Sequence, residues 1–261
     1  MDINSYYISD NEKPLDKIVS DGGFCGIFRS IAFIGDSLSS GEFQTVDEDG
    51  NNHYYDLYEY SWGQYIARMT GCKAYNFSKG GMSAREYWNF FADYCGFWGR
   101  DKAAQAYVIA LGVNDLFGQK QELGTPCDYL EDKDTFACYY GKIVQKLKTI
   151  SPDAKFFFMT MPREDAEPGG AEGEEIKKKH SALLHEMTKI FDNSYVIDFN
   201  KYAPVYDKKF KDNFYFNGHM NAAGYLLTAK MAASYIDYII RSNPKDFTAA
   251  GLIGSGIDPH I

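Results

Sequence analysis

Residues 30–39 read Ser30-Ile31-Ala32-Phe33-Ile34-Gly35-Asp36-Ser37-Leu38-Ser39, an apolar run of strand length followed directly by small polar residues. Further along the chain, apolar residues recur at helical spacing, most clearly over 136–150 and 226–240. Near-continuous apolar strands that alternate with amphipathic helices predict a parallel sheet covered by helices on both faces. The sequence therefore predicts an α/β fold. The expected strands lie at 30–35, 73–77, 106–112, 155–161 and 195–199.

Three long connections leave the carboxyl ends of the expected strands, at 39–56, 116–135 and 163–175. The first contains Asp49-Gly50 between polar and aromatic residues, which favours a hairpin turn. Ligands of open parallel sheets bind at the carboxyl ends of the strands, and long ordered loops there are often binding loops or lids. We expect the three loops to border a pocket, and simple surface decoration is the alternative.

The composition narrows the class of protein. A chain of 261 residues is compatible with one α/β domain over 1–261, with its core at about 30–240, a lead-in before it and a tail after it. The net charge of -9 argues against nucleic acid as a partner, because phosphate binding needs a basic surface. Since no apolar run approaches the length of a membrane-spanning helix, we expect no membrane partner. No basic and apolar leader is visible, so the expected location is cytoplasmic.

Three polar residues at the ends of apolar runs have the chemistry of acyl transfer. Ser37 follows the first expected strand, Asn114 follows the third, and His219 precedes the start of a helix. They supply a nucleophile, a donor to an oxyanion and a base. Ser37 and Asn114 each have a structural alternative, because Ser and Asn are also common in turns and helix caps.

A glycine pair follows the second expected strand, in Lys79-Gly80-Gly81-Met82-Ser83. A glycine at Gly81 would let the backbone approach a substrate and present an N–H group, although an ordinary loop glycine is the alternative. No Gly-Lys-Ser/Thr sequence occurs in the order that a phosphate-binding loop requires, which disfavours a flavodoxin-like nucleotide binder.

Together, these stretches resemble the SGNH hydrolases, the GDSL esterase/lipase superfamily. The resemblance implies that Ser37 is the nucleophile and that His219 is the general base. It also implies an oxyanion hole made by the N–H groups of Ser37 and Gly81 and the side chain of Asn114. The expected fold is a three-layer flavodoxin-like sandwich with a five-stranded parallel sheet. The expected reaction is ester hydrolysis through an acyl-enzyme, without a metal or other cofactor.

The sequence departs from the family pattern at the catalytic acid. The family usually has an aspartate three residues before the histidine, where this chain has Phe216. A carboxylate normally holds the imidazole in the correct tautomer. Asp212 would reach His219 if 212–218 formed a tight loop, and Asp212 is therefore the candidate acid. The alternative is a backbone carbonyl, which would leave a Ser–His dyad.

The expected function is a serine esterase that acts on short-chain acyl esters of small molecules or carbohydrates. Four tyrosines near the first long loop suggest O-acetyl groups on sugars, because tyrosine rings can stack on a sugar; the alternative is that they pack the loop onto the body. A catalytically impaired ligand- or glycan-binding protein with the same fold is the competing interpretation. The tyrosines are Tyr54, Tyr55, Tyr58 and Tyr60.

Overall fold

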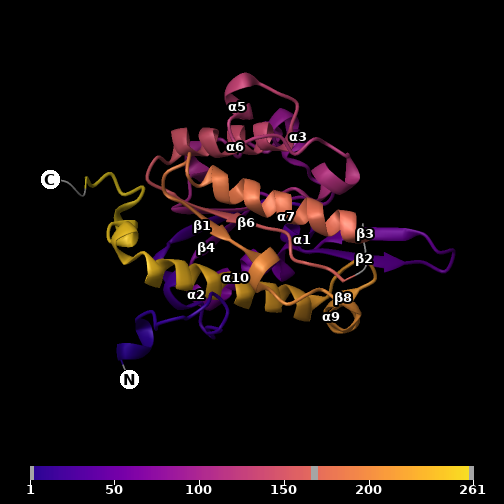
Figure 1. Cartoon of the computed structure of the whole chain (residues 1–261), viewed down its shortest axis with the longest axis horizontal. Coiled ribbons are helices and arrows are strands. Elements are labelled where there is room, and N and C mark those ends of the chain that lie inside the picture. The colour runs from indigo at the N-terminus through magenta and orange to yellow at the C-terminus, as the bar shows by residue number, and fades with distance from the viewer. Residues whose placement is uncertain (1–2, 166–169, 259–261) are drawn as a thin grey trace.

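A computed structural model describes residues 3–165 and 170–258 of the chain and has a five-stranded parallel sheet at its centre (Figure 1). The strand order is β4-β1-β5-β6-β7. Numbered along the chain, the strands of this sheet therefore run 2-1-3-4-5, the flavodoxin-like order. The predicted fold class is confirmed. The strands are β1 (Ser30–Gly35), β4 (Lys73–Asn76), β5 (Ala106–Ala110), β6 (Lys155–Met159) and β7 (Ser194–Ile197).

Helices cover both faces of the sheet (Figure 1). Helices α2 (Trp62–Thr70) and α10 (Ala222–Ser242) pack on one face, and α6 (Phe136–Ile150) and α7 (Gly170–Met187) pack on the other. Alternate residues of β1 enter the two cores, because successive side chains of a strand point to opposite faces. Phe33 lies in the core under α2 and α10, whereas Ile34 lies in the core under α6 and α7.

Polar caps fix where the long helices begin. The side-chain oxygens of Ser61, Thr135 and Asn221 accept backbone N–H groups in the first turns of α2, α6 and α10. Such caps satisfy donors that have no partner inside the helix. The cap at Asn221 matters most for the site, because it fixes the start of α10 three residues after His219.

Two antiparallel hairpins and several short helices surround the carboxyl edge of the sheet. The first hairpin pairs β2 (Glu42–Val46) with β3 (Asn52–Asp56), and the second pairs β8 (Tyr215–Phe216) with β9 (His219–Met220). The short α-helices are α1 (Ser37–Ser40), α3 (Ala84–Glu86), α4 (Ala92–Tyr94), α5 (Asp128–Glu131), α8 (Phe199–Tyr202) and α9 (Lys208–Phe214). Tyr87–Phe91 and Asn114–Gly118 are π-helical turns, and 3-10 turns lie at Ile3–Tyr6, Gly23–Ile27, Tyr58–Tyr60, Arg100–Lys102, Pro244–Phe247 and Ala250–Leu252.

The predicted elements form, with differences at their ends. The third and fourth strands were predicted to reach residues 112 and 161, but β5 ends at Ala110 and β6 ends at Met159. Leu111 and Met161 are buried all the same, so the apolar pattern continues after the backbone has left the sheet. Residues 84–94 form three short elements in succession: α3, the π-helical turn Tyr87–Phe91 and α4. The predicted hairpin turn at Asp49-Gly50 is confirmed by the pairing of β2 with β3.

The tail after α10 packs back onto the body. Phe247 is buried against the core under α10, and the Arg29 guanidinium donates to the carbonyls of Gly251 and Ile253. Of the helices in residues 3–165 and 170–258, none is both long and apolar enough to cross a membrane.

Candidate active site

Ser37, Asn114 and His219 line one cavity of about 320 Å³. Ser37 follows β1 and Asn114 follows β5, so both lie at the carboxyl ends of neighbouring strands. The chain passes from β1 to β4 on one side and from β5 to β6 on the other, so the strand order reverses between β1 and β5. Ligands of such folds bind at this point of reversal. The structure therefore brings together three of the residues that the sequence singles out, from segments separated by up to 182 positions (219 − 37).

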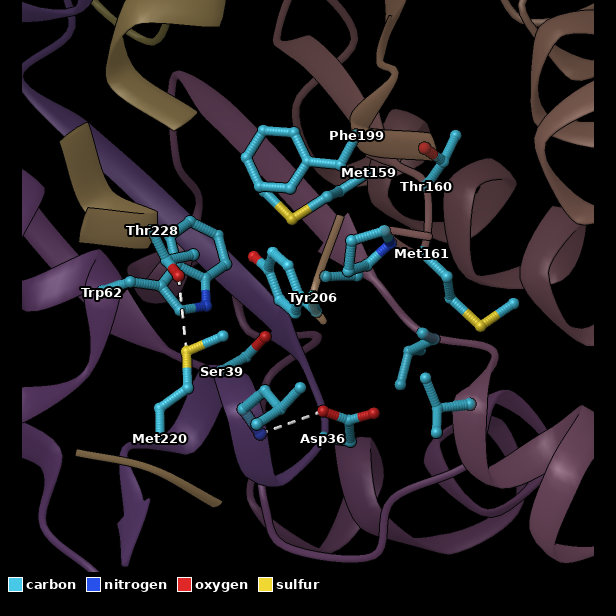
Figure 2. Close-up of a pocket in the computed structure, with 15 residues that line it drawn as sticks. Asp36, Ser39, Trp62, Met159, Thr160, Met161, Phe199, Tyr206, Met220 and Thr228 are labelled. Carbon is cyan, nitrogen blue, oxygen red and sulfur yellow. Dashed lines mark hydrogen bonds between the residues drawn. The ribbon is translucent and has the colours of Figure 1, made fainter. Parts of the chain in front are cut away.

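Asp36 fixes the turn that presents Ser37. Its Oδ1 accepts the N–H of Leu38 at 3.0 Å and caps α1 (Figure 2). Burial raises the pKa of the Asp36 carboxyl to about 6. Because Ser37 is the first residue of α1, its N–H has no acceptor within that helix and can serve an oxyanion. Within the described part of the chain, the Ser37 hydroxyl has no hydrogen-bond partner.

Asn114 is held by the loop after β4. Its Nδ2 donates to the carbonyl of Met82 at 3.1 Å. A side-chain amide carries two N–H donors, so one remains for a substrate oxygen. The neighbouring Asp115 is fully buried and accepts the N–H of Ala84 at 2.8 Å. These two bonds tie the loops after β4 and β5 to each other at the edge of the cavity.

A buried histidine supports the loop after β5 from beneath. Gly112 has φ +136, and a Cβ there would lie 2.8 Å from Nε2 of His180, so only glycine fits. Burial lowers the pKa of His180 to about 4, which keeps this ring neutral at ordinary pH. The close packing of His180 on Gly112 helps to position Asn114, two residues later.

Gly81 lies close to this site but does not line the cavity. It occupies the turn in which the N–H of Met82 bonds to the carbonyl of Lys79, and its φ of +73 favours glycine. The adjacent Gly80 packs on Glu42, and a Cβ added to Gly80 would collide with Glu42 Oε2. The loop after β4 therefore needs both glycines, each for a different reason.

The β2–β3 hairpin supplies both polar partners of His219. Gln44 Oε1 lies 3.1 Å from Nδ1, and Glu42 Oε1 lies 3.0 Å from Nε2. The amide nitrogen of Gln44 donates to Asn52 Oδ1 at 2.8 Å, so its oxygen faces the imidazole. An amide oxygen only accepts, which assigns the ring proton to Nδ1 and leaves the lone pair of neutral His219 on Nε2.

Gln44 also fixes the backbone before His219. Its Oε1 accepts the N–H of Gly218 at 3.0 Å, and its carbonyl accepts Nδ2 of Asn217 at 3.0 Å. The first hairpin thus holds the turn of the second hairpin and the imidazole that follows this turn.

Burial disfavours charge on both members of the Glu42–His219 pair. It raises the pKa of Glu42 to about 7, with a further contribution from the nearby carboxylates of Asp56 and Asp36. Burial also lowers the pKa of His219. Near neutral pH, His219 is therefore neutral and Glu42 is partly protonated.

Asp212, the predicted acid, does not contact His219. It is an exposed residue of α9, and both of its carboxylate oxygens accept from Lys208, at 2.8 and 2.7 Å. Residues 208–214 are helical and the β8–β9 hairpin follows, so the tight 212–218 loop that would bring Asp212 to His219 does not form. Glu42 and Gln44, whose oxygens face the two ring nitrogens of His219, were not predicted. Their spacing of two on one strand was the available signal.

A second, smaller cavity shares part of its lining with the first, and Figure 2 shows the side chains that line it. Its volume is about 70 Å³, and its walls are mostly apolar, with Met159, Phe199 and Trp62 among them. Both cavities are lined by Asp36, Leu38, Val113, Met161 and Pro162. Within the described residues, no group of three or more His, Cys, Asp or Glu side chains is arranged to hold a metal ion.

Solved structures with this fold include two carbohydrate esterases. One is a carbohydrate esterase family 2 enzyme plus carbohydrate binding domain from Corynascus thermopiles (Myceliophthora fergusii), with a TM-score of 0.58, 19% identity, and coverage of 81% of this chain and 66% of that chain. The other is a family two carbohydrate esterase from Clostridium thermocellum in complex with cellohexaose, with a TM-score of 0.57, 17% identity, and coverage of 84% and 65%. This chain thus spans about two thirds of each. At these identities the likeness shows the fold alone.

A third structure, of a protein from Lactobacillus plantarum, has a TM-score of 0.60, 18% identity, and coverage of 81% of this chain and 97% of that chain. Among curated proteins, none matches the sequence. The sequence matches the GDSL-like Lipase/Acylhydrolase family over residues 33–227, a segment that contains Ser37, Gly81, Asn114 and His219. The chain therefore belongs to this family of hydrolases.

Proposed function

We propose that this protein is a serine esterase that hydrolyses short-chain acyl esters, including O-acetyl groups on carbohydrates, through an acyl-enzyme. The observation that carries the proposal is the shared cavity of Ser37, Asn114 and His219. A nucleophile, a base and a donor to the oxyanion at one site are the parts that acyl transfer requires.

In the proposed reaction, Ser37 Oγ attacks the ester carbonyl while His219 Nε2 takes the hydroxyl proton. The N–H of Ser37, the N–H of Gly81 and the free donor of Asn114 stabilise the oxyanion. The proton then passes from Nε2 to the departing alcohol, and the acyl group stays on Ser37. Water attacks this ester with His219 again as the base, and the acid leaves.

Nε2 must exchange Glu42 for Ser37 before it can act as the base. In the structure, Nε2 faces Glu42 at 3.0 Å and the Ser37 hydroxyl has no hydrogen-bond partner among the described residues. Catalytic hydrogen bonds of a free enzyme often form fully only when substrate is present. Gln44 can keep its bond to Nδ1 throughout, and in this role it replaces the aspartate of other triads.

We expect Gln44→Leu to lower kcat by about tenfold or more, because Nδ1 loses its acceptor and the wrong tautomer becomes accessible. Asp212→Asn should change kcat by less than about twofold, because Asp212 forms an exposed ion pair with Lys208, away from His219. The measurement is steady-state hydrolysis of 4-nitrophenyl acetate by both variants, with thermal unfolding to confirm the fold. A large loss for Asp212→Asn with an intact fold would restore Asp212 as the acid.

The activity of the wild-type protein should rise with pH around a midpoint near 7. Below this midpoint Glu42 is increasingly protonated, and its carboxyl group, 3.0 Å from Nε2, competes for the lone pair that must accept the proton of Ser37. In Glu42→Gln this carboxyl group is absent and only His219 titrates, with a pKa that burial lowers, so the midpoint should fall below that of the wild-type protein. The profile of kcat/KM from pH 5 to 9 tests this, and equal midpoints in both proteins would exclude a contribution from Glu42.

Short acyl chains should be preferred to long ones. The main cavity contains the charged residues Glu164, Lys177 and Lys211, and its apolar neighbour has a volume of only about 70 Å³. We expect acetyl and butyryl esters of 4-nitrophenol to be hydrolysed at least about tenfold faster than the palmitoyl ester. Faster turnover of the palmitoyl ester would show that an acyl channel has been missed.

The position of Tyr54 favours a carbohydrate as the alcohol part of the ester substrate. Its ring is about half exposed and meets the His219 ring edge-on, with centroids 5.7 Å apart. An exposed aromatic ring beside the base can pack on the C–H face of a sugar. Tyr58 and Tyr60 instead contact the body, since the Tyr58 hydroxyl donates to the carbonyl of Ala74 and the Tyr60 ring packs on Phe43. The two solved carbohydrate esterases with this fold add support.

The competing function is binding without turnover, and the contact of Nε2 with Glu42 instead of Ser37 favours it. Hydrolysis of 4-nitrophenyl acetate separates the two functions. Turnover above the rate in buffer, abolished by a serine-directed phosphonate, supports the esterase. Absence of turnover together with saturable binding of an acetylated sugar supports the binding protein.

A further inference from the structure

Three charged side chains line the same cavity as Ser37, and we call them the charged wall: Glu164, Lys177 and Lys211. They come from the segment after β6, from α7 and from α9. Glu164 lies 3.7 Å from the Lys177 ammonium and 3.2 Å from the Lys211 ammonium. The Lys177 side chain is only 4% exposed, so a full charge is buried beside the candidate nucleophile.

The stability of the fold does not by itself explain why these charged side chains are buried. Burying an ion pair removes both charges from water, and apolar side chains of similar volume are often at least as stabilising. Lys177 also contacts Glu174 at 3.2 Å, so its charge is compensated twice over. Charged side chains that line the cavity of the candidate nucleophile in spite of this desolvation cost indicate a role in binding the substrate.

The geometry suits hydroxyl groups. The separation of 3.7 Å between Lys177 and Glu164 exceeds a direct hydrogen bond. A hydroxyl can accept from an ammonium and donate to a carboxylate at the same time, so a substrate hydroxyl can bridge this pair. Hydrogen bonds to charged groups are also stronger than those between neutral groups. Phe117 and Tyr215 line the cavity too and offer aromatic surface to the ring carbons.

The charge balance favours a neutral sugar. Glu174 joins Glu164 in offsetting Lys177 and Lys211, so the wall together with Glu174 carries no excess positive charge for an anionic sugar. We propose that the charged wall binds hydroxyl groups of a neutral sugar whose acetyl ester is held at Ser37. This inference rests on the proposed esterase function and assigns the residues that recognise the alcohol part of the substrate.

The test compares two acetate esters with the full-length protein: 6-O-acetylated methyl glucoside, which has hydroxyl groups, and 4-nitrophenyl acetate, which has none. The readout is the ratio of kcat/KM for the glucoside to kcat/KM for the aryl ester. Lys177→Met and Glu164→Gln should each lower this ratio by about tenfold or more, mainly through KM of the glucoside. Lys179→Met is the matched control, because Lys179 is an exposed lysine of α7 with a surface partner, Glu175. Its ratio should not change.

An unchanged ratio in both wall variants would overturn the inference, whether both esters slow equally or neither does. If Lys177→Met fails to fold, Glu164→Gln decides, since glutamine keeps the volume of glutamate. A wild-type protein that hydrolyses neither ester contradicts the proposed function itself, and the inference with it. A wild-type protein that hydrolyses both, with unchanged ratios in the variants, contradicts only the role of the wall.

Discussion

Ser37→Ala is expected to lower kcat for ester hydrolysis by about 10⁴-fold or more and to leave the fold intact. The substitution removes the atom that forms the acyl-enzyme. Residual rate would come from the oxyanion donors alone. The fold should tolerate the change because the hydroxyl has no hydrogen-bond partner within the described residues, and because α1 keeps its cap at Asp36. The measurement is hydrolysis of 4-nitrophenyl acetate, together with circular dichroism and thermal unfolding.

Ser39→Ala is the matched control for this variant. Ser39 belongs to the same short helix but lines the small apolar cavity instead of the main one. It should retain most of the activity. Equal activity of Ser37→Ala and the wild-type protein would remove Ser37 from the mechanism.

Asn114→Ala is expected to lower kcat by about 10²–10³-fold with a smaller change in KM. The lost donor matters most when negative charge develops on the substrate oxygen. Part of the loss in kcat will come from removal of the hydrogen bond between Asn114 Nδ2 and the Met82 carbonyl. This bond helps to hold the loops after β4 and β5 together.

Asn114→Asp keeps the size of the side chain but removes both of its donors, because a carboxylate can donate neither to an oxyanion nor to the Met82 carbonyl. It should lose at least as much activity as the alanine variant. A change confined to KM in both variants would mean that Asn114 binds the ground state, and the oxyanion assignment would then be wrong.

The fold could be predicted because its signals are local. Each buried strand is an apolar run, and α2, α6 and α10 each have an apolar stripe and a polar cap, so these elements are visible from local sequence. The ends of β5 and β6 could not be read in this way. Leu111 and Met161 are as apolar as the strands that they follow, but they face the site from loops.

The candidate site could be predicted only in part. Ser37 and Asn114 stand directly after strands, and the carboxyl ends of neighbouring parallel strands meet at one edge of the sheet. The surroundings of His219 depend instead on how the β2–β3 hairpin lies against a segment 175 residues away. No local pattern reports such a contact. Asp212 was the nearest carboxylate before His219 in the sequence, but α9 directs it to Lys208.

The proposed mechanism requires Ser37 to be the nucleophile. The most direct test is to label the wild-type protein with a fluorophosphonate and to locate the adduct by peptide mass spectrometry. We expect one adduct per chain, on Ser37, with loss of esterase activity in proportion to labelling and no adduct in Ser37→Ala. An adduct on another residue, or equal labelling of Ser37→Ala, would contradict this mechanism.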